Sequence, residues 1–357
     1  MSLSEIDWES FAALSLQEKA PYLSDPDREI HVLIPQQFSR ERLEALGTLA
    51  TQIRFVAKAK DGAFFLQSLL RHKRVMLYFT QPSTRTFLSF ASACQILGMG
   101  SADVRDSSTS SEFKGESQED SVRTFSSYFD CIVMRSREKG LAERMAWALS
   151  NSERPVPIVN AGSGRDQHPT QALLDIYTLQ RSFENRGGID GKRVVMVGDL
   201  KRGRTVRSLA VLLSRYRNMQ LVFVAPPALQ LDMDVLQELR EQGMDCVLTD
   251  AFEEAIADAD AIYMTRVQDE WDSEPGESRG IDASRYWFRS EHLQRLKPDA
   301  ILMHPLPRRQ EIATEVDRDP RAMYWRQMRN GMWIRAALFA SLFGCDSAIQ
   351  SYCDRHV

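Results

Sequence analysis

Short apolar runs rich in β-branched residues alternate along the chain with longer segments in which apolar residues recur every three or four positions. The short runs predict strands, and the longer segments predict helices. Strands are predicted at residues 74–79, 131–135, 156–161, 193–199, 221–227, 261–266 and 300–307. Strands that alternate with helices form parallel sheets covered by helices. We therefore predict an α/β fold of two tandem doubly wound parallel-sheet domains joined by interdomain helices.

Two long helical segments bear on the domain organisation. Residues 168–184, "HPTQALLDIYTLQRSFE", lie between the two sets of strands and precede the loop-like "NRGGIDGK". We predict that this helix bridges the domains. Residues 331–344, "GMWIRAALFASLFG", are apolar nearly all round and end at a glycine, which predicts a buried helix that returns to the first domain.

Composition and charge narrow the class of protein. The chain has 357 residues, 43% hydrophobic and 26% charged, which is typical of a globular protein with a large core. A net charge of -4 argues against a chain-wide surface for nucleic acid or membrane, so we expect neither as a partner. The N-terminus has acidic residues, and no run reaches the roughly 18 apolar residues of a membrane span. We expect a cytoplasmic protein whose five scattered cysteines are free thiols.

Polar side chains follow the predicted strands at the points where an open α/β sheet binds its ligands. They are Ser83 to Thr86 after the first strand, Arg135, His168, Arg204, Arg266, and residues 304–308 after the last. Any one of them alone would be read as a surface charge or a buried structural histidine. Ser83 to Thr86 also open a predicted helix, whose N-terminal amides favour an oxyanion such as phosphate. The shared position of these residues predicts an anion site.

Several common catalytic motifs are missing. The sequence contains no GxxxxGK[ST], no GxGxxG and no HExxH, which argues against a Walker loop, a dinucleotide turn and a catalytic metal. Ser83 has no GxSxG elbow around it, which argues against Ser83 as a serine nucleophile. We expect no metal and no cofactor. The remaining arginines, hydroxyls and histidine suit catalysis by positioning two substrates and stabilising an oxyanion.

Seven motifs, in order, resemble those of the aspartate carbamoyltransferase catalytic chain: "PSTRT", "KGES", "MR", "QHPTQALLD", "VGDLKRGRTVRSL", "YMTRVQ" and "HPLPRRQEI". The resemblance spans residues 34–343. It implies an N-terminal extension at 1–35, a carbamoyl-phosphate domain at 36–167 on which the C-terminal helix (331–357) packs back, and an aspartate domain at 168–330. The two domains of that family face each other across a cleft, and its catalytic chains form homotrimers with shared active sites.

The resemblance also implies a reaction and roles for individual residues. Carbamoyl phosphate and L-aspartate would give N-carbamoyl-L-aspartate and phosphate, a step of pyrimidine biosynthesis. The residues implied for carbamoyl phosphate are Ser83, Thr84, Arg85, Thr86, Arg135, His168, Gln171, Pro305, Leu306, and Ser110 from a neighbouring subunit. The residues implied for aspartate are Arg204, Arg266, Gln268 and Lys114, the last also from the neighbour and in contact with both substrates. The catalytic set implied is Arg85, Thr86, Lys114, Arg135 and His168.

Pro305 stands where ornithine carbamoyltransferases have a cysteine, and Arg266 with Gln268 matches the aspartate pattern. Three departures concern domain closure and the loop of Lys114: Gln81 replaces a glutamate, Trp271 an arginine, and Phe113 an often basic residue. Two alternatives stay open. They are a carbamoyltransferase for another amine-bearing dicarboxylate, and a catalytically silent homologue that serves as an assembly scaffold.

Overall fold

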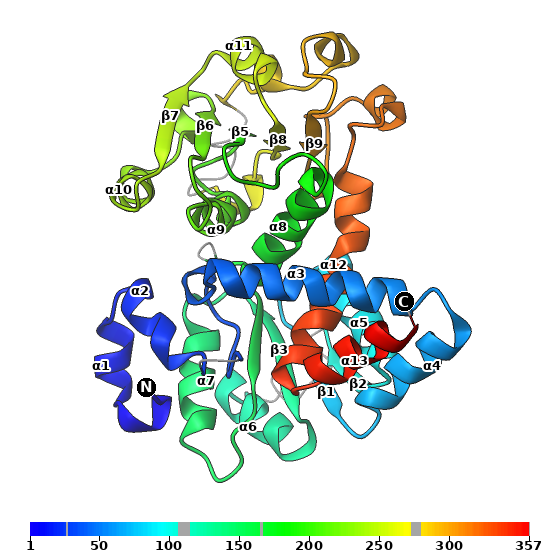
Figure 1. The fold of residues 1–357 in the computed structure, drawn as a ribbon. Coiled ribbons are helices and arrows are strands. Elements are labelled where there is room, and N and C mark those ends of the chain that lie inside the picture. The colour runs from blue at the N-terminus through cyan, green and yellow to red at the C-terminus, as the bar shows by residue number, and fades with distance from the viewer. Residues whose placement is uncertain (26–27, 106–114, 165–166, 273–279, 357) are drawn as a thin grey trace. The chain divides into compact units, whose positions relative to one another are not determined.

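The computed structural model describes residues 1–25, 28–105, 115–164, 167–272 and 280–356. The chain forms two compact units (Figure 1). Unit 1 contains Met1–Leu174 and Arg329–Val357, and unit 2 contains Asp175–Met328. The chain leaves unit 1 within helix α8 (Pro169–Phe183) and returns to it within α12 (Tyr324–Leu342). The prediction of an α/β fold with two parallel sheets and interdomain helices is confirmed.

Unit 1 is built on a four-stranded parallel sheet in the order β2-β1-β3-β4. Its strands are β1 (Arg74–Phe79), β2 (Gly100–Val104), β3 (Cys131–Ser136) and β4 (Ile158–Ser163). Its helices include α3 (Arg40–Val56), α4 (Lys60–Leu69), α5 (Thr84–Leu97), α6 (Gln118–Tyr128), α7 (Leu141–Ser150) and α13 (Asp346–His356). Every residue of β1 after Arg74 is buried, because the central strand is covered on both faces.

The N-terminal segment is part of the core of unit 1. Helices α1 (Trp8–Ala13) and α2 (Leu16–Lys19) pack beside α7, and Phe11 is fully buried there. Trp147 Nε1 donates a hydrogen bond of 2.8 Å to the carbonyl of Ile6, and Lys19 pairs with Glu143 at 2.6 Å. The apolar residues at the start of the chain therefore cover the outer face of α7.

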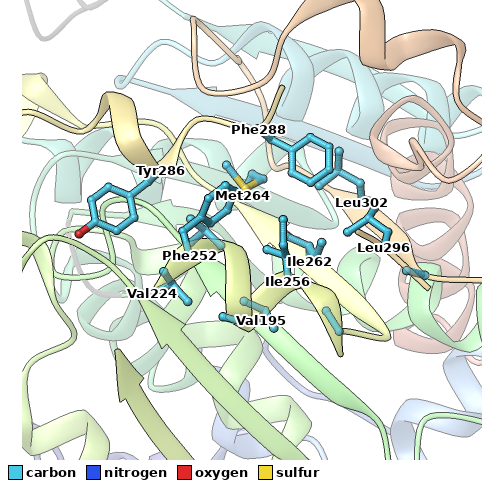
Figure 2. Close-up of a cluster of buried hydrophobic side chains, with 14 of the residues drawn as sticks. Val195, Val224, Phe252, Ile256, Ile262, Met264, Tyr286, Phe288, Leu296 and Leu302 are labelled. Carbon is cyan, nitrogen blue, oxygen red and sulfur yellow. The ribbon is translucent and has the colours of Figure 1, made fainter. Parts of the chain in front are cut away.

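Unit 2 is built on a five-stranded parallel sheet in the order β7-β6-β5-β8-β9. Its strands are β5 (Arg193–Val197), β6 (Gln220–Val224), β7 (Asp245–Thr249), β8 (Ala261–Met264) and β9 (Ile301–Met303). Its other helices include α9 (Arg204–Leu213), α10 (Met233–Glu241) and α11 (Phe252–Ala257). Figure 2 shows one core cluster of this unit, in which Val195 and Ile262 of neighbouring strands lie with Phe252 and Phe288.

A buried carboxylate links the two interdomain helices to the sheet of unit 2. Asp175 of α8 is fully buried and accepts hydrogen bonds from the Tyr263 hydroxyl at 2.8 Å and from Gln327 Nε2 at 2.6 Å. Tyr263 belongs to β8 and Gln327 to α12. Because a buried carboxylate is stable only when it is bonded, these contacts fix where both helices join unit 2.

The structure adds two strands to the seven that the sequence predicts. Both are edge strands, β2 ("GSADV") and β7 ("DCVLT"), and most of their side chains are exposed or half-buried. Such strands lack the continuous apolar run that marks a buried strand. The strand predicted at 300–307 ends earlier, at Met303, because Pro305 and Pro307 cannot donate to a ladder.

Helices α12 and α13 meet at a bend of 118°. No single helix in the described parts of the chain is long and apolar enough to cross a membrane. This bent pair meets the criterion only when its two helices are counted together.

Candidate active site

Each sheet has one topological switch point, and the predicted site residues lie beside both. In unit 1, β1 lies between β2 and β3, so successive connections leave β1 in opposite directions. In unit 2, β5 lies in the same way between β6 and β8. The loops after such strands diverge and leave a crevice at the carboxyl end of the sheet, where α/β proteins bind their ligands.

The N-terminus of α5 follows β1 at the switch point of unit 1. Ser83 is the N-cap, and its side chain makes no capping bond within the described chain. Thr84, Arg85 and Thr86 form the first helical turn, which contains no acidic residue. The amides of a first turn have no partner inside the helix, and the helix dipole adds positive potential there. This helix end is therefore suited to an oxyanion.

Arg135 lies next to this helix end. It belongs to β3, and its register partner on β1 is Phe79. The loop after β1 is tied to the same residue, since the amide of Gln81 donates to the Arg135 carbonyl at 3.2 Å. Arg135 Nη1 donates to the carbonyl of Ala161 at 2.9 Å and lies 3.4 Å from His168 Nε2. Arg135 thus connects the ends of β1, β3 and β4, through its backbone carbonyl toward β1 and through its guanidinium toward β4.

His168 directly precedes α8, and Gln171 lies in the first turn of that helix. Both side chains are buried, and the amide of Gln171 donates to the His168 carbonyl at 3.0 Å. A guanidinium carries only N–H donors, so its contact with Arg135 requires His168 Nε2 to accept. The structure brings together Ser83 to Thr86, Arg135, His168 and Gln171 around the switch point of unit 1.

In unit 2, the loops after β5 and β8 are joined by a carboxylate that the sequence reasoning missed. Asp199 is fully buried, and it accepts the amide protons of Arg202 at 3.1 Å and Gln268 at 3.0 Å. Burial raises the pKa of Asp199, against the effect of these two hydrogen bonds. A signal existed, because an aspartate directly after a buried strand in "VMVGD" has to find bonded partners.

Arg204 begins α9 and is buried. The preceding residue must be a glycine, since a Cβ on Gly203 would lie 2.7 Å from the Asp199 carbonyl oxygen and 3.5 Å from Gln268 Nε2. This close approach lets Gln268 lie against the start of α9. The structure therefore places Gln268 beside the N-terminus of α9, where Arg204 is the first helical residue.

Arg266 follows β8 by two residues and is held by an acid next to it. Its Nη1 donates to the carbonyl of Val267 at 2.9 Å and to Glu270 Oε2 at 2.8 Å, and its Nη2 donates to Glu270 Oε1. Burial acts to raise the pKa of Glu270, but the bonds from Arg266 outweigh it and lower that pKa. Glu270 thus fixes the direction of the guanidinium.

The loop after β9 contains Pro305 and Leu306 and is shaped by a buried histidine. His304 Nδ1 accepts the amide proton of Leu306 at 2.7 Å, and its Nε2 lies 2.8 Å from Glu311 Oε1. Burial lowers the pKa of His304 despite its bond to Glu311. Leu306 has a φ of 56°, a conformation that costs energy for a branched side chain and persists only when its surroundings impose it.

A cavity of ≈ 440 Å³ lies at the carboxyl ends of the strands of unit 2. Its walls include Thr265, Arg266, Tyr286, Trp287 and Arg309. It offers a guanidinium and an aromatic wall to a small polar ligand.

Some predicted site residues are not among those that the structure describes. Ser110, Phe113 and Lys114 lie outside the described residues, and the side chain of Trp271 is also outside them. Within the described ranges, no group of three or more His, Cys, Asp or Glu side chains could hold a metal ion.

The two sets of residues differ in their chemistry. The set in unit 1 combines helix-end amides, hydroxyls and arginines, which suit a phosphate dianion. The set in unit 2 combines Arg204, Arg266 and Gln268, and planar guanidinium groups suit carboxylates. This division fits one phosphorylated substrate and one substrate that carries carboxylates.

Known proteins match the chain over most of its length. Residues 30–181 match the carbamoyl-P binding domain of the aspartate/ornithine carbamoyltransferases, and residues 190–342 match their Asp/Orn binding domain. Aspartate carbamoyltransferase 1, chloroplastic, of Pisum sativum is 40% identical over 319 residues, which cover 87% of this chain and 78% of that protein. The chloroplastic enzyme of Arabidopsis thaliana is 39% identical over 315 residues, covering 87% of this chain and 77% of that protein.

Solved structures agree with these sequence matches. Aspartate transcarbamoylase from Trypanosoma cruzi in complex with carbamoyl phosphate and aspartate has a TM-score of 0.79 at 37% identity, over 87% of this chain and 96% of that one. The catalytic subunit of M. jannaschii aspartate transcarbamoylase has a TM-score of 0.76 at 34% identity, over 89% of this chain and 99% of that one. The chain therefore belongs to the aspartate/ornithine carbamoyltransferase family.

Proposed function

We propose that this chain transfers the carbamoyl group of carbamoyl phosphate to the amine of L-aspartate, giving N-carbamoyl-L-aspartate and phosphate. The observation that carries the proposal is the contact between Arg135 and His168 beside the N-terminus of α5. That arrangement pairs an anion-binding helix end with polar groups that can be directed at a carbonyl oxygen. Relatives named for this activity and a relative solved with both substrates support it.

Most of the residues proposed for the first substrate belong to unit 1. Ser83, Thr84, Arg85 and the first-turn amides of α5 bind the phosphate group, where charge-assisted bonds to a dianion are strong. The carbamoyl oxygen interacts with Thr86, Arg135 and His168. The carbamoyl NH2 interacts with Gln171 and with the backbone carbonyls of Pro305 and Leu306. Ser110 interacts with the phosphate.

The second substrate would be bound by Arg204, Arg266 and Gln268 of unit 2 through its carboxylates, with Lys114 in contact with both substrates. The neutral amine attacks the carbamoyl carbon, and an oxyanion develops on the carbonyl oxygen. The new C–N bond forms, the C–O bond to phosphate breaks, and the proton lost by the amine passes to the leaving phosphate. Arg135 and Thr86 stabilise the oxyanion, so their effect is greatest in the transition state.

We further propose a homotrimer in which Ser110 and Lys114 act on a neighbouring subunit. Edge strand β2 leads directly into the segment that contains both residues, and the residues of β2 before Val104 are exposed. Leu88 on α5 is also exposed, at 55%. An exposed apolar residue near an open sheet edge is a feature of a surface that pairs with another chain. Mass measurement in solution tests the trimer.

A ureido-product assay tests the reaction. Carbamoyl phosphate is offered with L-aspartate, L-ornithine and a panel of other amine-bearing dicarboxylates. Product with L-aspartate alone is expected. Product with a different dicarboxylate would keep the role of unit 1 and reject L-aspartate as the substrate, whereas no product with any amine would favour the silent scaffold.

A further inference from the structure

The turn after β8 carries three carboxylates, and each is paired with an arginine from a different part of unit 2. Asp269 pairs with Arg309 from the loop after β9, and Glu270 pairs with Arg266. Asp272 pairs at 2.6 Å with Arg202 from the loop after β5. The turn that contains Gln268, a proposed substrate ligand, is therefore surrounded by fixed charges.

Arg309 holds Asp269 in a two-bonded fork. Its Nη1 and Nη2 each donate a hydrogen bond of 2.9 Å, one to each carboxylate oxygen. The backbone of Arg309 is fixed as well, because its amide donates to both oxygens of Glu311 at 3.0 and 3.1 Å. Glu311 is buried and bonded to His304. The guanidinium thus extends from a rigid base toward the turn.

Asp269 is also close to Arg266. Its Oδ1 lies 3.7 Å from Arg266 Nη1, whose guanidinium already binds Glu270. The bonds of Arg266 within the described residues use three of the five N–H donors of a guanidinium. A second full carboxylate charge at this distance would compete with a substrate carboxylate for the donors that remain.

We infer that Arg309 is a positioning residue for the second substrate, because it binds Asp269 and so leaves Arg266 available to a carboxylate of the ligand. This inference rests on the proposed function, since it concerns the same set of residues. The hydrogen bonds from Arg309 lower the pKa of Asp269. An aspartate is ionised at neutral pH even without such bonds, so Asp269 would compete as a full charge if it were released.

The solvent exposure of the Arg309–Asp269 pair distinguishes a local electrostatic effect on Arg266 from a contribution to folding stability. The side chains of Arg309 and Asp269 are 53% and 47% exposed. Ion pairs in such positions contribute little to folding stability. A local effect on the charge near Arg266 is therefore the main consequence expected of the pair.

The test compares Arg309→Gln, Asp269→Asn and the double variant in the full chain. For each, KM for L-aspartate, KM for carbamoyl phosphate and kcat are measured. Arg309→Gln should raise KM for L-aspartate roughly tenfold, with kcat and KM for carbamoyl phosphate within about twofold of the unmodified protein. Asp269→Asn should raise KM for L-aspartate no more than about twofold. In the double variant, KM for L-aspartate should return to within about threefold of the unmodified protein, because the residue at position 269 no longer carries a charge that competes for Arg266.

A matched control is available in the same unit. Arg295 pairs with Glu253 at 2.6 Å, and both side chains are 52% exposed. Arg295→Gln removes a comparable ion pair away from the site and should leave KM for L-aspartate unchanged. The effect of Arg309→Gln should also shrink as salt is added, because the charges involved are exposed to solvent.

Two results would overturn the inference. The first is an unchanged KM for L-aspartate in Arg309→Gln. The second is an equal rise in Asp269→Asn, Arg309→Gln and the double variant, which is the pattern of a structural brace.

Calorimetric titration with succinate, a dicarboxylate without the reacting amine, separates this inference from the proposed function. It is carried out on the same variants in the presence of carbamoyl phosphate. Absence of ureido product together with the predicted order of succinate affinities would reject the function and keep the role of Arg309. Normal turnover of L-aspartate together with equal succinate affinities in all variants would keep the proposed function and reject the role of Arg309.

Discussion

A buried histidine in unit 1 makes a quantitative prediction about stability. His31 is 2% exposed, and its Nδ1 accepts the amide proton of Ile158 at 3.1 Å. Its Nε2 lies 2.9 Å from the Ser150 hydroxyl, to which it donates. A second proton on Nδ1 would remove the acceptor that Ile158 uses. Burial lowers the pKa of His31 to about 4.

The sign of the effect follows from the two states of the chain. In the unfolded chain the pKa of His31 is about 6.5. Between pH ~6.5 and pH ~4, the unfolded state therefore binds a proton at this residue and the folded state does not. The contribution of neutral His31 to the free energy of unfolding is therefore fully present above pH ~6.5 and is lost as the pH falls toward the folded-state pKa. The slope is about 1.4 kcal/mol per pH unit, or about 2 kcal/mol by pH 5 and about 3 kcal/mol in full.

His31→Asn is the informative variant. Its side-chain oxygen can still accept from Ile158, but it does not titrate in this range. Urea unfolding followed by tryptophan fluorescence at pH 7.5 and pH 5 gives the free energy of unfolding of each protein. The variant should be less stable at pH 7.5, having lost the bond to Ser150, and it should lose about 2 kcal/mol less than the unmodified chain between the two pH values. Equal losses in the two proteins would refute the reasoning.

Three other substitutions test the two sets of site residues. Arg85→Ala should lower kcat/KM at least about a hundredfold and abolish inhibition by inorganic phosphate, because a charge-assisted bond to the dianion is lost; steady-state kinetics would show normal values if Arg85 has no such role. His168→Ala should lower kcat more than it raises either KM, as expected for a group directed at developing charge, and the opposite split would point to ground-state binding. Asp199→Asn places an amide where two amide protons need an acceptor, at a cost of about 1–3 kcal/mol, so KM for L-aspartate should rise while KM for carbamoyl phosphate does not.

The architecture and the positions of the anion-binding residues could be predicted because both depend on local patterns. Central strands are buried on both faces and appear as apolar runs, and residues at their carboxyl ends meet at one edge of the sheet. Arg135 could be placed this way from its strand alone. Edge strands β2 and β7 do not have that pattern, since their side chains are largely solvated.

The contacts that hold the loops could not be predicted in the same way. Asp199 and Arg309 act through partners on other loops, and Glu311 acts through a histidine seven residues away, so these pairings depend on the three-dimensional course of the chain. A sequence shows that a buried acid needs a partner, but it does not show which amide or guanidinium supplies it. The electrostatics of a site are for this reason less predictable than its position.

The same contacts bear on Trp271, which stands where the resemblance expects an arginine. The residues on either side of it, Glu270 and Asp272, are each paired with an arginine of unit 2 itself, Arg266 and Arg202. The pair of Arg202 and Asp272 is buried, with side chains 7% and 9% exposed, so removal of either partner would leave a costly unpaired charge. The turn is therefore held in place within unit 2 without a charge at position 271. The direction of Arg266 accordingly depends on acids that belong to its own turn, and a change at Trp271 should affect that direction less than a change at Arg202.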